Sequence, residues 1–206
     1  MIKVPLKLYL VDSQLNTTMR FITGTLKPTP TRFLPVLSNI EPPKYRRSKA
    51  LLKEYIKITS NPHLLPNEIL PDLRRTRLIS RKPSLTTAEN LLQTNFNSKL
   101  MWKNEWENAS LQDLLQIKIS NNLPPGYDLP RKLWKTLNRI RCGVGNCKSS
   151  MFLWNFSNNP YCDCGEEQTI SHIVFECQIR KFNGSIEEIL NLSDFIDWLT
   201  NLDINL

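Results

Sequence analysis

The sequence lacks the residue combinations on which most enzyme active sites depend. It contains two histidines in 206 residues and no adjacent pair of aspartates. It also has no phosphate-binding P-loop, no G-x-S-x-G nucleophile elbow, no H-E-x-x-H motif and no glycine-rich dinucleotide fingerprint. Because acid–base and metal-assisted catalysis need such groups, the sequence predicts a chain that is not an enzyme as it stands.

Long apolar runs and a signal peptide are also missing. No stretch approaches the roughly 20 apolar residues of a membrane span. The apolar run at the start is interrupted at Asp12, too early for a secretory leader. Cysteines are five, an odd number, and four of them lie within residues 147–177. We therefore expect metal ligands before disulfides, an intracellular reducing compartment (nuclear or cytoplasmic) and no membrane partner.

Glycine is scarce, with 6 residues against 14 prolines, which predicts short elements joined by rigid connections. Apolar spacing predicts a mainly α fold. The expected helices cover 11–26, 44–59, a segment that a Thr86–Glu89 capping box opens before Leu92, a segment from Arg131, a short one through Phe152 and Trp154, and one from Ser193.

Prolines divide this helical pattern into three expected parts. Residues 1–43 end in a connector, 27–43, whose five prolines forbid a regular helix and predict an extended chain. Residues 44–128 form an irregular, basic helical linker. Residues 129–206 form a small C-terminal helical unit with a Cys/His knuckle.

Charge separates the same regions. Residues 1–150 hold 25 Lys and Arg against 10 Asp and Glu, a net charge of +15, whereas 151–206 hold 2 against 9, a net −7. Such asymmetry favours a polyanionic partner, RNA or DNA, for the basic part. A basic surface that is merely solvated is the alternative, and charge alone does not separate the two.

The helix from Arg131 concentrates this charge on one face. At 100° per residue, Leu133, Trp134, Leu137 and Ile140 share one side. Four basic residues share the other side, and three more precede the Thr86 helix. The candidate nucleic-acid-binding residues are thus Arg131, Lys132, Lys135, Arg139, Arg74, Arg75 and Arg77.

The cysteine cluster has the form C-x-C-x7-H-x4-C, with Cys162, Cys164, His172 and Cys177 as candidate ligands. Three thiolates and one imidazole suit a tetrahedral structural zinc ion. Thr169 can cap a helix that carries His172. On an ideal helix Cys177 would lie about 140° round from His172, so it can bind the same ion only if that helix ends or bends before it.

The alternative for this cluster is a set of buried or redox-inert cysteines beside a surface histidine. Cys142 and Cys147 are expected in the core, although they are also spare ligands in principle. His63, next to Pro62, is expected in an exposed loop.

Several blocks resemble the C-terminal region of non-LTR retrotransposon reverse transcriptases of the jockey-like group. PRKLWKTLNRIRCGVGNCKSSMFLWNF (130–156), CDCGEEQTISHIVFEC (162–177) and DWLTNLDINL (197–206) resemble the tail of these RNA-directed DNA polymerases, and VDSQLNTTMRFITGTLKPTPTRFLPVLSNIEPP (11–43) resembles the region after their palm. LNRIRCGVGNC and the CDCG…H…C block are the most specific parts, and the resemblance covers nearly the whole chain.

This resemblance implies a thumb-like remnant in 1–43 and a CCHC zinc knuckle at Cys162, Cys164, His172 and Cys177. The family's catalytic aspartates belong to the palm, so the resemblance implies a non-catalytic piece that helps to hold template RNA or target DNA, with a palm domain in trans as a further partner. The competing interpretation is a zinc-stabilised protein-interaction module whose basic surface is only solvated.

Overall fold

The computed structural model describes residues 6–61, 63, 84–109, 117–119 and 121–206. The chain divides into two compact units, one made of 1–40 with 111–206 and the other of 41–110. The described residues are mainly helical, which confirms the expected fold class. Their β structure is a single antiparallel bridge between Tyr161 and Glu167. The units differ from the three parts expected from the sequence, because the N-terminal segment groups with the C-terminal one.

Helix α1 (Leu6–Thr23) ends at Gly24, which adopts the left-handed conformation with φ +71°. The Gly24 N–H closes the helix by donating to Arg20 O at 2.8 Å. The sequence-based bounds, 11–26, therefore began and ended too late. No described helix combines the length and the apolar character needed to cross a membrane.

A short helix, α2 (Phe33–Ser38), lies within the connector that was expected to be extended. That prediction was wrong for these residues. Pro35 is the third residue of the helix, where a missing N–H removes no intrahelical hydrogen bond. All five residues from Phe33 to Leu37 are buried, so packing selects the helical conformation.

The second unit consists of α3 (Pro43–Thr59), α5 (Ser84–Gln93) and α6 (Ser98–Asn108), with α5 and α6 both packed on α3. The expected helix through Leu92, Phe96 and Leu100 is broken, because Asn95 has φ +47° and Asn97 caps α6 by accepting from Leu100 N at 3.1 Å. Thr86 lies inside α5 and does not begin it.

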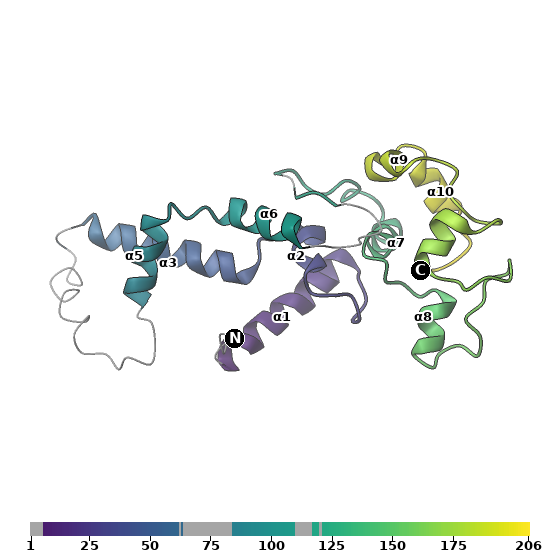
Figure 1. The fold of residues 1–206 in the computed structure, drawn as a ribbon, viewed down its shortest axis with the longest axis horizontal. Coiled ribbons are helices and arrows are strands. Elements are labelled where there is room, and N and C mark those ends of the chain that lie inside the picture. The colour runs from purple at the N-terminus through teal and green to yellow at the C-terminus, as the bar shows by residue number, and fades with distance from the viewer. Residues whose placement is uncertain (1–5, 62, 64–83, 110–116, 120) are drawn as a thin grey trace. The chain divides into compact units, whose positions relative to one another are not determined.

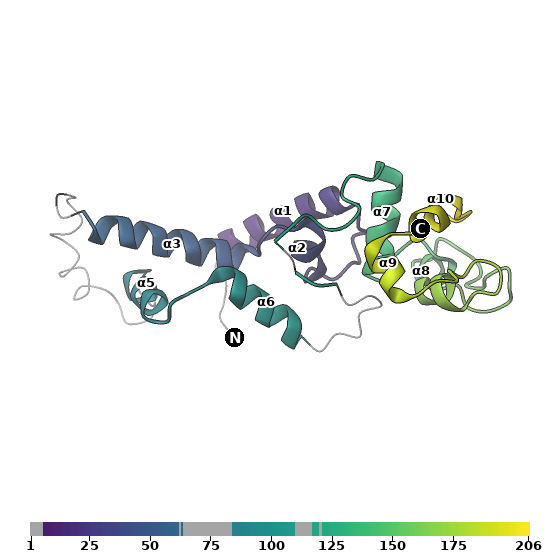
Figure 2. The same cartoon turned by 90° about the horizontal axis from the view of Figure 1, so that it is seen from above.

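Helix α7 (Arg131–Arg141) is the centre of the first unit and begins where the sequence predicted. Figures 1 and 2 show it between α1 on one side and α9 (Ile186–Asn191) and α10 (Phe195–Asn201) on the other. Figure 1 also shows α8 (Lys148–Leu153) beside the C-terminal segments. The core of this unit consists of Trp134, Leu137, Ile140, Cys147, Ile170, Ile173, Val174, Ile189, Leu192, Phe195, Leu199 and Leu206.

The polar side of α7 holds the end of α1. A helix leaves its last carbonyls without intrahelical partners, and here four consecutive ones accept from α7 side chains. Arg131 donates to Phe21 O and to Ile22 O. The remaining bonds run from Trp134 Nε1 to Ile22 O at 2.9 Å, from Asn138 Nδ2 to Thr23 O at 2.9 Å and from Arg139 Nε to Gly24 O at 3.0 Å.

Replacing Gly24 tests this contact. An added Cβ would overlap Lys135 Cγ and lie 2.9 Å from Lys135 Cβ, in addition to the strain of a positive φ. We expect Gly24→Ala to lower the free energy of unfolding of this unit by about 2–4 kcal/mol. Amide hydrogen exchange in α1 and α7 measures it.

Gly143 is the matched control, because its φ is +64° but an added Cβ there meets no atom within 4 Å. Gly143→Ala should cost only the backbone strain, about 1 kcal/mol. Equal losses of protection in the two variants would show that α1 and α7 do not pack as described.

A polar contact in the second unit, between Tyr45, Lys44 and Glu105, depends on pH. Tyr45 donates to Glu105 Oε2 at 2.5 Å, and Lys44 bonds the other carboxylate oxygen. Partial burial raises the pKa of Glu105, but these two hydrogen bonds outweigh it and hold the pKa below its ordinary 4.5.

A lowered carboxyl pKa stabilises the folded state above the unfolded pKa, and this contribution disappears as the pH falls through the folded pKa. Because the carboxylate is about half exposed, we expect Glu105→Gln to cost less than about 1 kcal/mol at pH 7 and nothing at an acidic pH at which the carboxyl is protonated in both the folded and the unfolded state. Urea unfolding at both pH values is the measurement, with Glu107→Gln on the same helix as control. A cost that grows on acidification would contradict the stated cause.

Candidate metal centre

The structure brings together the four residues that the spacing selected. Cys162 Sγ lies 3.7 Å from Cys177 Sγ, Cys164 Sγ lies 3.1 Å from His172 Nε2, and Cys177 Sγ lies 3.9 Å from Cys164 Sγ. The four ligand atoms are all within 4.8 Å of one another, so they can hold one metal ion. Ligands bound to one tetrahedral zinc ion are roughly 3.3–3.8 Å apart, close to these separations.

The first two ligands are held by a tight turn. Cys162 N donates to Glu166 O at 2.7 Å, and Gly165 N donates back to Cys162 O at 2.9 Å. Gly165 has φ +96°, a backbone conformation that side-chain-bearing residues rarely adopt. The turn therefore presents the Cys162 and Cys164 sulfurs to one point.

The other two ligands lie at the ends of a π-helical turn, η1 (His172–Glu176). Thr169 Oγ1 accepts from His172 N at 3.0 Å, which confirms the predicted cap. Cys177 N then donates to His172 O at 2.7 Å, across five residues, and Cys177 continues in an extended conformation. The wider turn supplies the bend that Cys177 required.

Most of the site is shielded from solvent. Cys162, His172 and Cys177 are buried, and Cys164 is half-buried. A cavity of about 340 Å³ opens beside Cys164 and His172 and is lined by Glu166, Glu167 and Glu176, among others. Since four protein ligands complete a tetrahedron, an ion here has no open position for a substrate, and the arrangement is that of a structural site.

Polar groups around Cys162 favour the charged form of its sulfur. Gln168 Nε2 lies 3.7 Å from Cys162 Sγ, and Arg180 approaches the same sulfur at 3.6 Å. Burial raises the pKa of the Cys162 thiol, but hydrogen bonds from the Cys164 backbone and Gln168 outweigh it and lower the pKa to about 6. The pKa of Cys164 is raised, because burial and the neighbouring thiols outweigh a backbone bond from Glu166.

Arg180 is a supporting residue that the sequence analysis missed. Its guanidinium bonds Asp163 at 2.6 Å and Asp203 at 2.7 Å, and its carbonyl accepts from Trp198 Nε1 at 2.7 Å. It thus connects the metal-binding turn to α10 and the segment after it. The sequence feature that could have identified Arg180 is the basic pair that it forms with Lys181 in an otherwise acidic segment.

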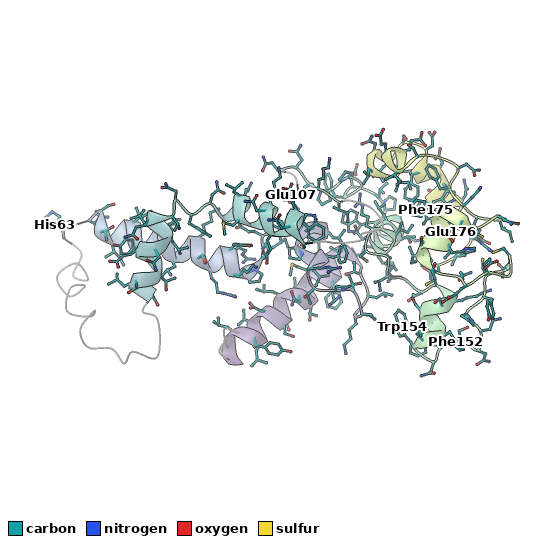
Figure 3. The ribbon with its side chains drawn as sticks, viewed as in Figure 1. His63, Glu107, Phe152, Trp154, Phe175 and Glu176 are labelled. Atoms are coloured by element: carbon teal, nitrogen blue, oxygen red, sulfur yellow. The ribbon has the colours of Figure 1, made fainter. Side chains whose placement is uncertain are left out.

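Two further residues, Gln168 and Glu176, lie beside the ligands. Gln168 is buried and also accepts from Lys148 N at 2.9 Å. Glu176 places a carboxylate oxygen 4.0 Å from His172 Nδ1, the ring nitrogen that faces away from the sulfurs. Such outer groups commonly fix the orientation of a metal-bound imidazole. Figure 3 shows Glu176 and Phe175 in this turn, and Phe152 and Trp154 at the end of α8.

The other predicted site residues have different surroundings. Cys142 and Cys147 are buried outside the cluster, as expected, and His63 is exposed. Arg74, Arg75 and Arg77 lie outside the described residues.

The predicted basic face of α7 is only partly solvent-exposed. Lys132 and Arg131 are exposed and Lys135 is half-buried, but Arg139 is buried, which corrects its expected position. Arg139 donates to Gly24 O and to Leu206 O, because α1 covers this side of the helix.

No protein-family model, curated protein or solved structure matches this chain. The candidate metal site is therefore defined by the geometry of its own residues.

The site predicts a specific effect of removing one ligand. Cys177→Ser should abolish stoichiometric binding of a divalent metal and expose the core around Ile173 and Val174, since η1 ends at this ligand. Titration with Co²⁺, followed by its thiolate absorption, measures binding. Cys147→Ser is the control, because Cys147 is equally buried but lies outside the cluster. Full cobalt binding by Cys177→Ser would contradict the assignment.

Proposed function

We propose that this chain is a non-catalytic nucleic-acid-binding segment stabilised by one structural zinc ion. The observation that carries the proposal is the convergence of Cys162, Cys164, His172 and Cys177, whose ligand atoms all lie within 4.8 Å of one another. Three thiolates and an imidazole favour zinc among the common divalent ions. Elemental analysis of protein purified without chelator tests the identity of the metal, and an absence of zinc would reject it.

The resemblance to jockey-like reverse transcriptases supports the nucleic-acid part of the proposal. Its most specific blocks coincide with α7 and with the metal-binding segment, which share one core. In this proposal the zinc unit fixes α7, and the basic residues of 1–150 contact the phosphates of template RNA or target DNA. Polymerase chemistry would belong to a palm domain, acting in the same protein or in trans.

A second candidate, a protein-interaction module, is favoured by apolar side chains near α8. Phe152, Leu153 and Phe156 are exposed, Leu153 and Phe156 by 74% each. Arg131 and Arg139 also serve the α1–α7 contact, which lowers the number of basic groups available to a polyanion.

Salt dependence separates the two candidates. Phosphate contacts release counterions, so affinity for RNA should fall by roughly 0.7–0.9 log units per contact for each tenfold rise in salt. Lys132→Gln with Lys135→Gln should lower both the affinity and this slope, because neither lysine has a hydrogen-bond or ion-pair partner within the described chain. Fluorescence anisotropy of labelled RNA over a salt series is the measurement.

The control is Lys181→Gln, which removes one charge from the acidic C-terminal part and is compared with Lys132→Gln alone. Equal effects of these two single variants, or no RNA binding by the parent chain, would favour the interaction module. Arg139 is left unchanged, since its loss would disturb the fold itself.

A further inference from the structure

A groove of about 920 Å³ lies within the first unit, between α1, the turn after it and α7. Among the charged side chains that line it, one is acidic, Asp12. The basic ones are Arg20, Lys27, Arg131, Lys135 and Arg139. Five positive charges against one negative charge make an anion the complementary occupant.

The arginines in this groove are held in place by the backbone. Arg20 donates to Leu26 O at 2.7 Å, and Arg131 and Arg139 donate to carbonyls at the end of α1. Carbonyls do not neutralise a guanidinium, so the positive charge persists in a fixed position. Burial lowers the pKa of Arg139, and the nearby Arg131 charge lowers it further against an opposing effect of Cys142.

The two lysines supply the adaptable cations. Lys27 is exposed and Lys135 half-buried, and neither has a hydrogen-bond or ion-pair partner in the part of the chain that the structure describes. An ammonium on a flexible stem binds a phosphate as a point charge and tolerates variation in its position.

The same groove contains two exposed aromatic rings from α1, Tyr9 (64% exposed) and Phe21 (74% exposed). Twelve residues of helix separate them by about 18 Å along its axis. Rings beside a row of cations suit a ligand with both phosphates and flat apolar faces. An extended stretch of several nucleotides has this composition.

We propose that this groove binds single-stranded nucleic acid, with phosphates at Lys27 and Lys135 and bases stacked on Tyr9 and Phe21. This inference rests on the proposed nucleic-acid binding and specifies its location and strandedness. A duplex keeps its base faces stacked inside, so it can use the lysines but not the rings.

The experiment compares labelled single-stranded RNA with a blunt RNA duplex in the full chain. Tyr9→Ala with Phe21→Ala should weaken single-strand binding by roughly ten- to a hundredfold and change duplex binding by less than about twofold. Phe21→Trp should restore most of the loss caused by Phe21→Ala. Lys27→Gln with Lys135→Gln should weaken the binding of both ligands.

Phe156→Ala is the matched control, because Phe156 is as exposed as Phe21 (74%) but does not line the groove. It should leave single-strand affinity unchanged. Far-UV circular dichroism and metal content establish that each variant is folded.

Three results would overturn the inference, and they can be distinguished from one another. If the parent chain binds neither form of RNA, the proposed function and the proposed groove are both rejected. Parent chain that binds RNA, with Tyr9→Ala and Phe21→Ala having no more effect than Phe156→Ala, rejects the groove alone. An equal loss for single strand and duplex in the aromatic variants also rejects it, since it would mean that the rings serve the fold.

Discussion

The first unit depends on how α1 ends. Its last carbonyls have no intrahelical partners, and leaving a buried carbonyl such as that of Thr23 unbonded costs about 1–3 kcal/mol. Side chains spaced along α7 donate to the carbonyls of Phe21, Ile22 and Thr23 and to that of Gly24, which follows the helix. This arrangement fixes the position of α1 on α7, explains the need for glycine at the end of α1, and makes Asn138 and Arg139 interior residues.

The metal centre is attached to the opposite side of the same helix. Ile173 and Val174, inside η1, belong to the core that includes Leu137 and Phe195. The π-helical turn therefore has two tasks: it packs two apolar side chains on α7, and it aligns His172 with Cys177. A regular α-helix of the same length would direct Cys177 away from the other ligands. Helix α7 thus connects the site to the basic groove through packed side chains.

Sequence reasoning identified what depends on local pattern. The ligands followed from residue type and spacing, the start of α7 from Pro130 and its apolar period, and the cap at Thr169 from its place before His172. Sequence reasoning failed where contact with a second structural element determines the conformation or the burial of a residue. A helical projection assigned Arg139 to solvent because α1 is not part of that projection. The helix at Phe33–Ser38 exists because its side chains are buried, and Arg180 reaches Cys162 only in the folded chain.

The span between Cys162 and Cys177 has a thermodynamic consequence. An ion bound by both joins points that are 15 residues apart, and a permanent cross-link of that length contributes about 3 kcal/mol through the entropy of the unfolded chain. A coordinated ion differs from a disulfide because it is exchangeable, so mass action applies. Each tenfold change in free ion above the dissociation constant changes the stability of the folded unit by about 1.4 kcal/mol. The stability of the packing around α7 would then depend on the free metal concentration in the compartment that surrounds the protein.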